Sequence, residues 1–187
     1  MGNVMKIYPT EIPGLMIMEN ELHTDNRGAF SRLFCNESLK EHLGSSQIVQ
    51  INHSITYTAG TVRGLHYQKP PHAEIKMVRC QKGKVWDIAV DLRSGSPTFL
   101  KWHAEELSSD NRRMMIIPEG CAHGFQTLEE NSELLYLHTA PYTPSAEAGI
   151  QANDPLLAIS WPLPIQDLSD RDRSHPLLTA SFTGLTV

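Results

Sequence analysis

Apolar residues occur in short runs along most of the chain, and turn-forming residues separate these runs. Gly-containing turns stand at 59–60, 82–83 and 118–120. Short strands with such regular punctuation predict an all-β fold, either a sandwich or a barrel. The segments that predict strands, each rich in apolar or β-branched residues, are 47–57, 75–80, 84–92, 113–117 and 133–139.

Helical signals are few. One short helix is predicted over 37–43, with Asn36 as its N-cap and Gly44 just past its end. From residue 153 onward prolines recur and strand signals are sparse, which predicts ordered coil with short helical turns packed on the barrel. No linker or repeat interrupts the chain, so we expect one domain over residues 1–187, long enough to bury a core.

Composition narrows the class of protein. The chain is 40% hydrophobic and 20% charged, with a formal net charge of −5. This balance argues against nucleic-acid or anionic-membrane binding through bulk charge, but it allows a local basic pocket. The three cysteines, Cys35, Cys80 and Cys121, are too widely spaced for a disulfide framework or a CxxC zinc site. With no N-terminal apolar run typical of a signal peptide or membrane span, a cytoplasmic protein is expected.

The segment 61–80 carries unusual charge for a strand-like sequence. It is either a solvated hairpin or the wall of a site that handles an anion and a proton. Strand alternation places His66 on the face of Gln68 and turns Arg63 away, although a bulge at Gly64 would bring Arg63 to the same side. A histidine alone on a strand is more often a structural hydrogen-bonding residue than a base, so His66 needs a partner.

A second signal is IPEGCAHGF at 117–125, which contains one half of the cupin signature, PxGxxH. In that motif a Pro-Gly turn leads into a strand whose histidine, here His123, faces the barrel interior. Metal-binding cupins carry HxH in the upstream half, whereas this chain has His66 and Gln68. Glutamine is a poor ligand for a transition metal. A metal site of His66, Glu74 and His123 is therefore the lesser alternative.

Taken together, the motifs resemble those of the dTDP-4-dehydrorhamnose 3,5-epimerase family. The matching stretches cover most of the chain in order, and they include DNRGAF (25–30), TVRGLHYQ (61–68), DLRSGSPTF (91–99), IPEGCAHGF (117–125) and LSDRD (168–172). The resemblance implies a cupin jelly roll, or double-stranded β-helix, with a few short peripheral helices. It also implies a homodimer and epimerisation of a dTDP-linked 4-keto-6-deoxy sugar through an enolate, with no redox cofactor and no metal.

The resemblance assigns the proton-transfer residues. His66 matches the base, and Asp172 matches the carboxylate that orients it, although Ser169-x-x-Asp172 by itself reads as a helix capping box. Lys76 matches the lysine beside the sugar ketone, where an ammonium stabilises the enolate. Tyr136 matches the proton donor, and strand alternation turns it away from its two leucine neighbours.

Further residues match substrate contacts. Arg63 and His123 match the diphosphate-binding positions, and a guanidinium suits bidentate phosphate binding. The remaining matches are Gln50 and Asn52 for sugar or phosphate, and Arg27, Phe30, Glu147 and Arg171 for the nucleotide side. In this family the N-terminal segment often reaches the partner subunit, so Arg27 is expected to act across a dimer.

Departures from the family pattern fall among the substrate-binding positions and not among the proton-transfer residues, so the sequence defines the reaction more narrowly than the substrate. Arg32 stands where members often have an acidic residue, Pro141 where an aromatic is common, and Arg171 where lysine is frequent. Three alternatives follow: an epimerase of carbon 3 only, a metal-dependent cupin enzyme, and a non-catalytic sugar-nucleotide binding module. The intact set of acid and base residues argues against the last.

Overall fold

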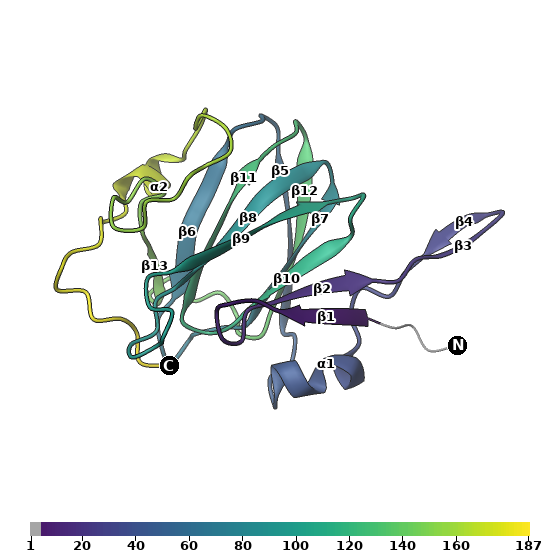
Figure 1. The fold of residues 1–187 in the computed structure, drawn as a ribbon, viewed down its shortest axis with the longest axis horizontal. Helices are drawn as coiled ribbons and strands as arrows, with labels where there is room; N and C mark the ends of the chain where they lie inside the picture. The colour runs from purple at the N-terminus through teal and green to yellow at the C-terminus, as the bar shows by residue number, and fades with distance from the viewer. Residues whose placement is uncertain (1–4) are drawn as a thin grey trace.

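Two antiparallel sheets face each other and enclose the core (Figure 1). The computed structural model describes residues 5–187. In spatial order, the six-stranded sheet contains β1 (Met5–Pro9), β2 (Met16–Asn20), β10 (Arg113–Ile117), β7 (Lys76–Lys82), β12 (Ser132–His138) and β5 (Gln50–Thr56). The five-stranded sheet contains β13 (Glu147–Gly149), β6 (Val62–Gln68), β11 (Cys121–Thr127), β8 (Lys84–Asp91) and β9 (Trp102–Ser108). This arrangement agrees with the expected all-β jelly roll.

The remaining elements are short. A two-stranded hairpin of β3 (His23–Asp25) and β4 (Gly28–Phe30) projects from the body of the molecule (Figure 1). The helices are α1 (Asn36–Leu43) and α2 (Asp170–Ser174). Within the described part of the chain, neither helix has the length and apolarity that crossing a membrane requires.

The five predicted strands correspond to β5, β7, β8, β10 and β12. The predicted helix is confirmed as α1, but its N-cap was placed one residue late. Cys35 holds the N-cap position without a side-chain cap bond, and Asn36 is already helical. Gly44 does end the helix: its φ of 58° suits glycine, and its N–H donates to the Lys40 carbonyl at 2.9 Å.

Three apolar clusters hold the sheets in place. The first lies between the sheets and includes Val78 and Leu134 from one and Ala89 and Phe125 from the other. The second lies outside the six-stranded sheet, where α1 buries Leu39 and Leu43. Burial of such side chains from both faces of a sheet is the main driving force for this layered arrangement.

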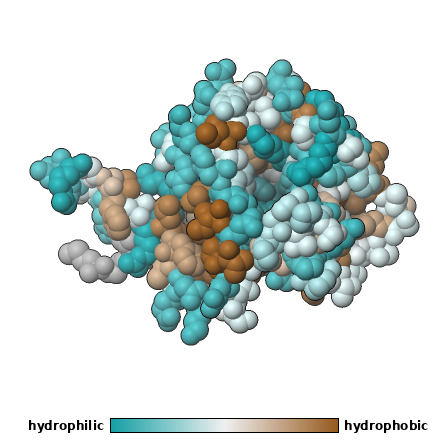
Figure 2. All heavy atoms as spheres, turned by 180° about the vertical axis from the view of Figure 1, so that it is seen from behind, coloured by the Kyte–Doolittle hydropathy of each residue, from teal (hydrophilic) through white to brown (hydrophobic). Residues whose placement is uncertain are grey.

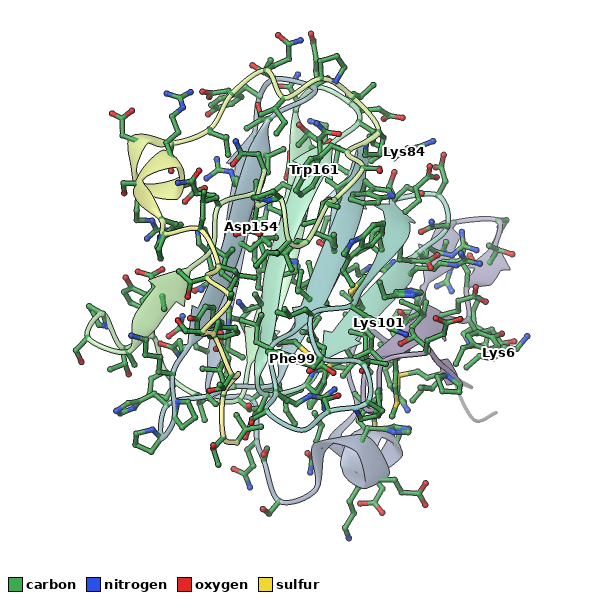
Figure 3. All side chains as sticks on the ribbon, turned by 60° about the vertical axis from the view of Figure 1, so that its left-hand side comes forward. Lys6, Lys84, Phe99, Lys101, Asp154 and Trp161 are labelled. Atoms are coloured by element: carbon green, nitrogen blue, oxygen red, sulfur yellow. The ribbon has the colours of Figure 1, made fainter. Side chains whose placement is uncertain are left out.

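The third cluster lies on the outer face of the five-stranded sheet, where the C-terminal tail covers Leu65, Ile88 and Val90. The tail crosses this face as irregular chain, with Trp161 and Asp154 set against the strands (Figure 3). Trp161 Nε1 donates to the Ala152 carbonyl at 2.8 Å, which satisfies its polar group inside the cluster. The prediction of an ordered tail packed on the barrel is confirmed, and the tail positions α2 beside β6.

Candidate active site

An open cavity of about 1100 Å³ lies between the two sheets at one end of the barrel. Ten of the twelve predicted site residues line it; they are His66, Asp172, Tyr136, Lys76, Arg63, His123, Gln50, Asn52, Glu147 and Arg171. Arg27 and Phe30 do not. They lie on the projecting β3–β4 hairpin, where Phe30 is 67% exposed. The structure therefore gathers the predicted proton-transfer residues at one site.

Strand register explains one wall of the cavity. Tyr136 on β12 is opposite Asn52 on β5, and His138 is opposite both Gln50 and Lys76. Because side chains alternate between the faces of a strand, this set faces one side of the six-stranded sheet. The neighbours Leu135 and Leu137 pack on the other side in the α1 cluster. The predicted inward direction of Tyr136 is thus confirmed.

The opposite wall comes from β6 and β11, where His66 pairs with His123. The β6–β11 register shifts between His123 and Phe125, so the predicted irregularity beside Gly64 is confirmed. Gly64 has φ 125° and lies so close to Gly124 that a Cβ would sit 2.6 Å from the Gly124 Cα. Only glycine fits there, and the shift brings Arg63 to the cavity with His66.

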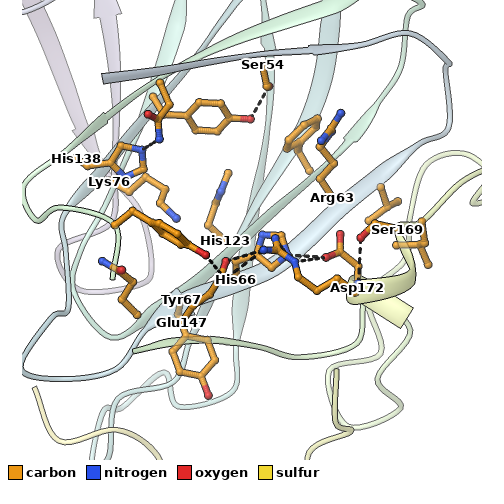
Figure 4. A pocket seen from close by; sticks show the side chains of 18 of the residues that line it. Ser54, Arg63, His66, Tyr67, Lys76, His123, His138, Glu147, Ser169 and Asp172 are labelled. Carbon is orange, nitrogen blue, oxygen red and sulfur yellow. Dashed lines mark hydrogen bonds and ion pairs between the residues drawn. The ribbon is translucent and has the colours of Figure 1, made fainter. Parts of the chain in front are cut away.

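His66 has the partner that its proposed role as a base requires. Its Nε2 lies 2.7 Å from Asp172 Oδ1, although 106 residues separate the two (Figure 4). Asp172 is only 4% exposed, and its other oxygen accepts the Gly64 N–H at 3.1 Å. The backbone N–H of Asp172 donates to Ser169 Oγ, so the capping interpretation of this motif is also correct.

The charge of Asp172 fixes the tautomer of His66. Burial alone would raise the pKa of Asp172, but the hydrogen bonds and charge of His66, with the Gly64 N–H, lower it to about 2. An ionised carboxylate only accepts hydrogen bonds, so Nε2 of His66 carries the proton that bonds Asp172. The second ring nitrogen, Nδ1, is then free of a proton and can act as a base.

Tyr136, the predicted proton donor, is held inside the cavity. Its hydroxyl lies 2.9 Å from Ser54 Oγ, and its ring lies 6.3 Å, centroid to centroid, from that of His123. Burial raises the pKa of Tyr136 well above its ordinary value. The phenol therefore keeps its proton at neutral pH, as an acid must before it donates.

Lys76 belongs to a charged group that sequence reasoning missed. Its Nζ lies 3.3 Å from Glu74 Oε1, and the other Glu74 oxygen lies 2.8 Å from His138 Nδ1. Burial opposes ionisation of Glu74, but His138 and Lys76 together lower its pKa. Asn52 Nδ2 lies 3.2 Å from His138 Nε2, which completes the network. Lys76 is therefore not an exposed strand lysine; its side chain is 13% exposed and held toward the cavity.

His123 also has an acidic partner that sequence reasoning missed. Its Nε2 lies 2.8 Å from Asp87 Oδ1, and the Asp87 side chain is fully buried. Burial lowers the pKa of His123 and raises that of Asp87, which favours a neutral pair. The sequence feature that could have pointed to this partner was the single aspartate, Asp87, inside the apolar run VWDIAV. The expectation that His123 contacts a diphosphate stays a prediction.

The residues predicted to lie on the nucleotide side of the cavity combine opposite charges. Arg171 Nη1 lies 3.1 Å from both Glu147 oxygens, and the Tyr142 hydroxyl donates to Glu147 at 2.7 Å. Tyr142 lines the cavity although its neighbour Pro141 does not. Arg32 does not line the cavity either, and Arg32 and Pro141 each accept a hydrogen bond at the backbone carbonyl.

The predicted metal alternative fails on geometry. Glu74 and His123 bond other partners. The donor atoms of His66, Glu74 and His123 do not form a group within 4.8 Å of one another, as metal ligands would. Over residues 5–187, the one cluster of three potential ligands is His66, Asp172 and His175. Gln68, the residue that replaces the second cupin histidine, binds loop backbone: it donates to the His72 carbonyl at 3.0 Å. Cys121 is buried and its pKa is raised to about 12 by that burial, so it is no nucleophile, as expected.

Comparison with known proteins agrees with this geometry. The family model for dTDP-4-dehydrorhamnose 3,5-epimerase matches residues 9–180. The Salmonella typhimurium protein named dTDP-4-dehydrorhamnose 3,5-epimerase is 42% identical over 177 residues, covering 94% of this chain and 96% of that protein.

Solved structures extend the comparison. A Legionella pneumophila 3,5-epimerase in complex with dTDP-4-keto-L-rhamnose is 41% identical, with a TM-score of 0.88 and 93% of each chain covered. ChmJ, a 3'-monoepimerase from Streptomyces bikiniensis in complex with dTDP-quinovose, is 32% identical, with a TM-score of 0.84, and covers 91% of this chain and 86% of its own.

Proposed function

This chain belongs to the dTDP-4-dehydrorhamnose 3,5-epimerase family of isomerases, and we propose that it inverts carbons 3 and 5 of dTDP-4-dehydro-6-deoxyglucose to give dTDP-4-dehydrorhamnose. The ketone at carbon 4 acidifies the protons on both flanking carbons. A base removes one proton, an enolate forms, and an acid returns a proton to the opposite face. Only protons move, so this reaction needs neither a redox cofactor nor a metal.

The observation that carries the proposal is the placement of base and acid on opposite walls of one cavity. His66 and Asp172 lie on the β6 side, and Tyr136 lies on the β12 side. A sugar ring held between the walls presents one face to each. Removal of a proton by His66 and its return by Tyr136 then invert the carbon, whereas a single residue would return the proton to the face it came from.

Each remaining residue has a defined part in this proposal. Asp172 holds the His66 ring and stabilises the imidazolium that forms when His66 takes the proton. The Lys76 ammonium lies on the acid side of the cavity, where it stabilises the negative charge that develops on the ketone oxygen. Glu74 and His138 hold Lys76 in place by the ion pair and hydrogen bond described above.

A local positive charge for the diphosphate stands out against the acidic net charge. Arg63 bonds Thr56 Oγ1 at 3.0 Å and the Ile55 carbonyl at 3.3 Å. Neither contact is anionic, and across residues 5–187 no carboxylate pairs with Arg63. Its guanidinium is thus available to a phosphate, and Gln50 and Asn52 line the same cavity from β5.

A second candidate function is inversion at carbon 3 alone. It is favoured by one observation, the similarity to the 3'-monoepimerase ChmJ at 32% identity. The two reactions use the same base and acid, so the number of exchanged positions on the sugar separates them.

A homodimer completes the proposal. The β3–β4 hairpin carries exposed Arg27 and Phe30 away from its own cavity (Figure 1). The edge strand β5 also exposes Ile51 at 61% and Ile55 at 40%, and apolar side chains gather on the face seen in Figure 2. We assign the hairpin to the cavity of a second copy, where Arg27 and Phe30 reach the nucleotide side.

The single domain over 1–187 stays a prediction, since residues 1–4 lie outside the described part.

The first experiment is proton NMR of the protein with dTDP-4-dehydro-6-deoxyglucose in deuterium oxide, after dialysis against a chelator. Loss of the proton signals at carbons 3 and 5 supports the double epimerase. Loss at carbon 3 alone supports the second candidate. Binding of the sugar nucleotide without exchange at either carbon would contradict both, and would leave a binding module.

A further inference from the structure

A second histidine stands beside the His66–Asp172 pair and has no part in the proposed reaction. His175 follows α2 directly, and its ring meets that of His66 edge to face, with centroids 5.5 Å apart and planes at 75°. Its Nε2 lies 3.7 Å from Asp172 Oδ1, too far for a hydrogen bond. Asp172 therefore stands between two imidazoles but bonds only one of them.

The free nitrogen of His175 is buried. Nε2 has no hydrogen-bond partner among the described residues, and the side chain is 13% exposed. An unpaired buried polar atom costs free energy, so a partner that fills the gap would be stabilising.

The surrounding chain makes room for this ring and fixes it. Gly149 on β13 passes so close that a Cβ there would sit 2.4 Å from the His175 imidazole. Gln151 Nε2 donates to the His175 carbonyl at 2.7 Å, which anchors the backbone. Asp172 is held by the Gly64 N–H. Two of the three donors are thus held in place by groups outside the cluster.

We propose that His66, Asp172 and His175 form a binding site for a divalent cation of the Zn²⁺ type, and that an occupied site silences the base. Their donor atoms all lie within 4.8 Å of one another. Two imidazoles and one carboxylate are a common donor set for zinc, and a fourth ligand can enter from the cavity that His66 and Asp172 line.

The rearrangement that the cation requires is small. Donors at zinc–ligand distances stand about 3.3 Å apart around a tetrahedral ion. The present separations from Asp172 Oδ1 are 2.7 Å to His66 and 3.7 Å to His175. The carboxylate therefore moves by less than about 1 Å, away from the first ring and toward the second.

Inhibition follows from the protons on His66, and this step rests on the proposed function. In the metal-free site Nε2 carries the ring proton and Nδ1 accepts the substrate proton. To bind a cation at Nε2, the ring changes tautomer: the proton leaves Nε2 for Nδ1, and the lone pair left on Nε2 binds the cation. The ring neither gains nor loses a proton in this step. Nδ1 then has no lone pair to accept a proton, so enolate formation stops while sugar-nucleotide binding through Arg63 remains.

One charge opposes the cation. Arg171 places Nη2 3.3 Å from His66 Nε2 and Nε 3.7 Å from Asp172 Oδ1. Its side chain is 53% exposed, so it can turn toward solvent when a cation enters. Removal of Arg171 should therefore tighten metal binding, whereas removal of His175 should weaken it.

The binding test uses Co²⁺, whose visible absorption reports tetrahedral coordination, on chelator-treated full-length protein, followed by displacement with Zn²⁺. We expect one equivalent in the wild type, at least tenfold weaker binding in His175→Ala, and tighter binding in Arg171→Leu. His175→Gln serves if the alanine variant fails to fold, and His72→Ala controls for surface histidines. No Co²⁺ spectrum in the wild type, or an unchanged affinity in both His175 variants, would overturn the site.

The activity test adds Zn²⁺ to the deuterium-exchange assay. We expect exchange by the wild type to stop at saturating Zn²⁺ and to return with chelator, while His175→Ala or His175→Gln keeps its own metal-free rate. Zn²⁺ binding that depends on His175 but leaves exchange unchanged would overturn the inhibitory role. A protein that binds Zn²⁺ but never catalyses exchange contradicts the proposed function and leaves the metal site standing.

Discussion

His66 and Tyr136 enter one cavity from opposite sheets of the barrel. His66 on β6 is directly opposite His123 on the neighbouring strand β11. The centroid of the His123 ring lies 6.3 Å from that of Tyr136, which is on β12 in the other sheet. In the proposed reaction, a sugar between these walls meets a base on one face and an acid on the other. This relationship makes inversion, rather than exchange with retention, the expected result of catalysis.

Replacement of the base should abolish proton removal. His66→Ala removes the imidazole that Asp172 holds in the cavity, so we expect the deuterium-exchange rate to fall by roughly 10²–10⁴. Proton NMR measures this with the same substrate. His72→Ala is the matched control, because His72 lies on the exposed loop and not in the cavity. An exchange rate in His66→Ala that equals the wild-type rate would assign the base elsewhere.

Replacement of the acid should separate exchange from inversion. Tyr136→Phe keeps the ring and its packing but removes the hydroxyl that lies 2.9 Å from Ser54. His66 can still take a proton and return deuterium to the same face. We expect deuterium at the exchanged carbons with the starting stereochemistry, and net inversion slower by roughly 10²–10⁴. Ser54→Ala is the control for the hydrogen bond alone; an inverted product at the normal rate from Tyr136→Phe excludes the phenol as the acid.

Removal of the charge at Lys76 should slow enolate formation with little effect on nucleotide binding. Lys76→Met keeps most of the side-chain volume, and we expect a loss of roughly 10²–10³ in the exchange rate, as for other preorganised donors to an oxyanion. Dissociation constants for dTDP should change little, because in the proposed function Lys76 contacts the sugar ketone and not the nucleotide. Lys82→Met, on the same strand but 64% exposed, is the matched control. Equal losses in both variants would point to altered strand structure instead.

Subunit mixing tests the proposed exchange of hairpins. Arg27→Ala impairs the hairpin, and His66→Ala impairs the base. If each hairpin completes the cavity of the partner, a mixed dimer has one cavity with both an intact His66 and an intact Arg27. Mixing the two weak variants, with brief unfolding and refolding to exchange subunits, should then restore part of the activity. A mixture no more active than the sum of its parts means that Arg27 does not act across a dimer.

Acid should remove a structural contribution from Asp91. The Asp91 side chain is fully buried and bonds Arg93, Ser96 and Thr98. Burial opposes ionisation, yet these hydrogen bonds lower its pKa from 3.8 to about 2. A lowered pKa stabilises the fold above the unfolded value, so this contribution is complete above about pH 4 and disappears as the pH falls toward 2.

Urea unfolding of Asp91→Asn tests this. At pH 7 we expect a free energy of unfolding lower than the wild type by on the order of 2 kcal/mol, and a gap that narrows as the pH falls toward 2. The exposed Asp110→Asn is the control. A gap that stays constant with pH would mean that Asp91 contributes through shape and not through charge.

The sequence by itself determined the strand-rich fold, the positions of β5, β7, β8, β10 and β12, the inward direction of Tyr136 and the family motifs around His66 and His123. These features follow from residue spacing, since alternation along a strand fixes the face of each side chain. The sequence also indicated the irregularity at Gly64, because glycine in a charged strand suggests a bulge.

Tertiary structure alone decided which faces meet. The pairing of Glu74 with His138 spans 64 residues and no motif indicated it. That of His66 with Asp172 spans 106 residues, and only the family resemblance suggested it before the structure placed the two side chains together. The partner of His123, Asp87, lies on a different strand, and His175 comes from the irregular tail. Such contacts depend on sheet order and on how the tail folds over the barrel. Local alternation sets the direction of a side chain, but only closure of the two sheets decides what it meets there.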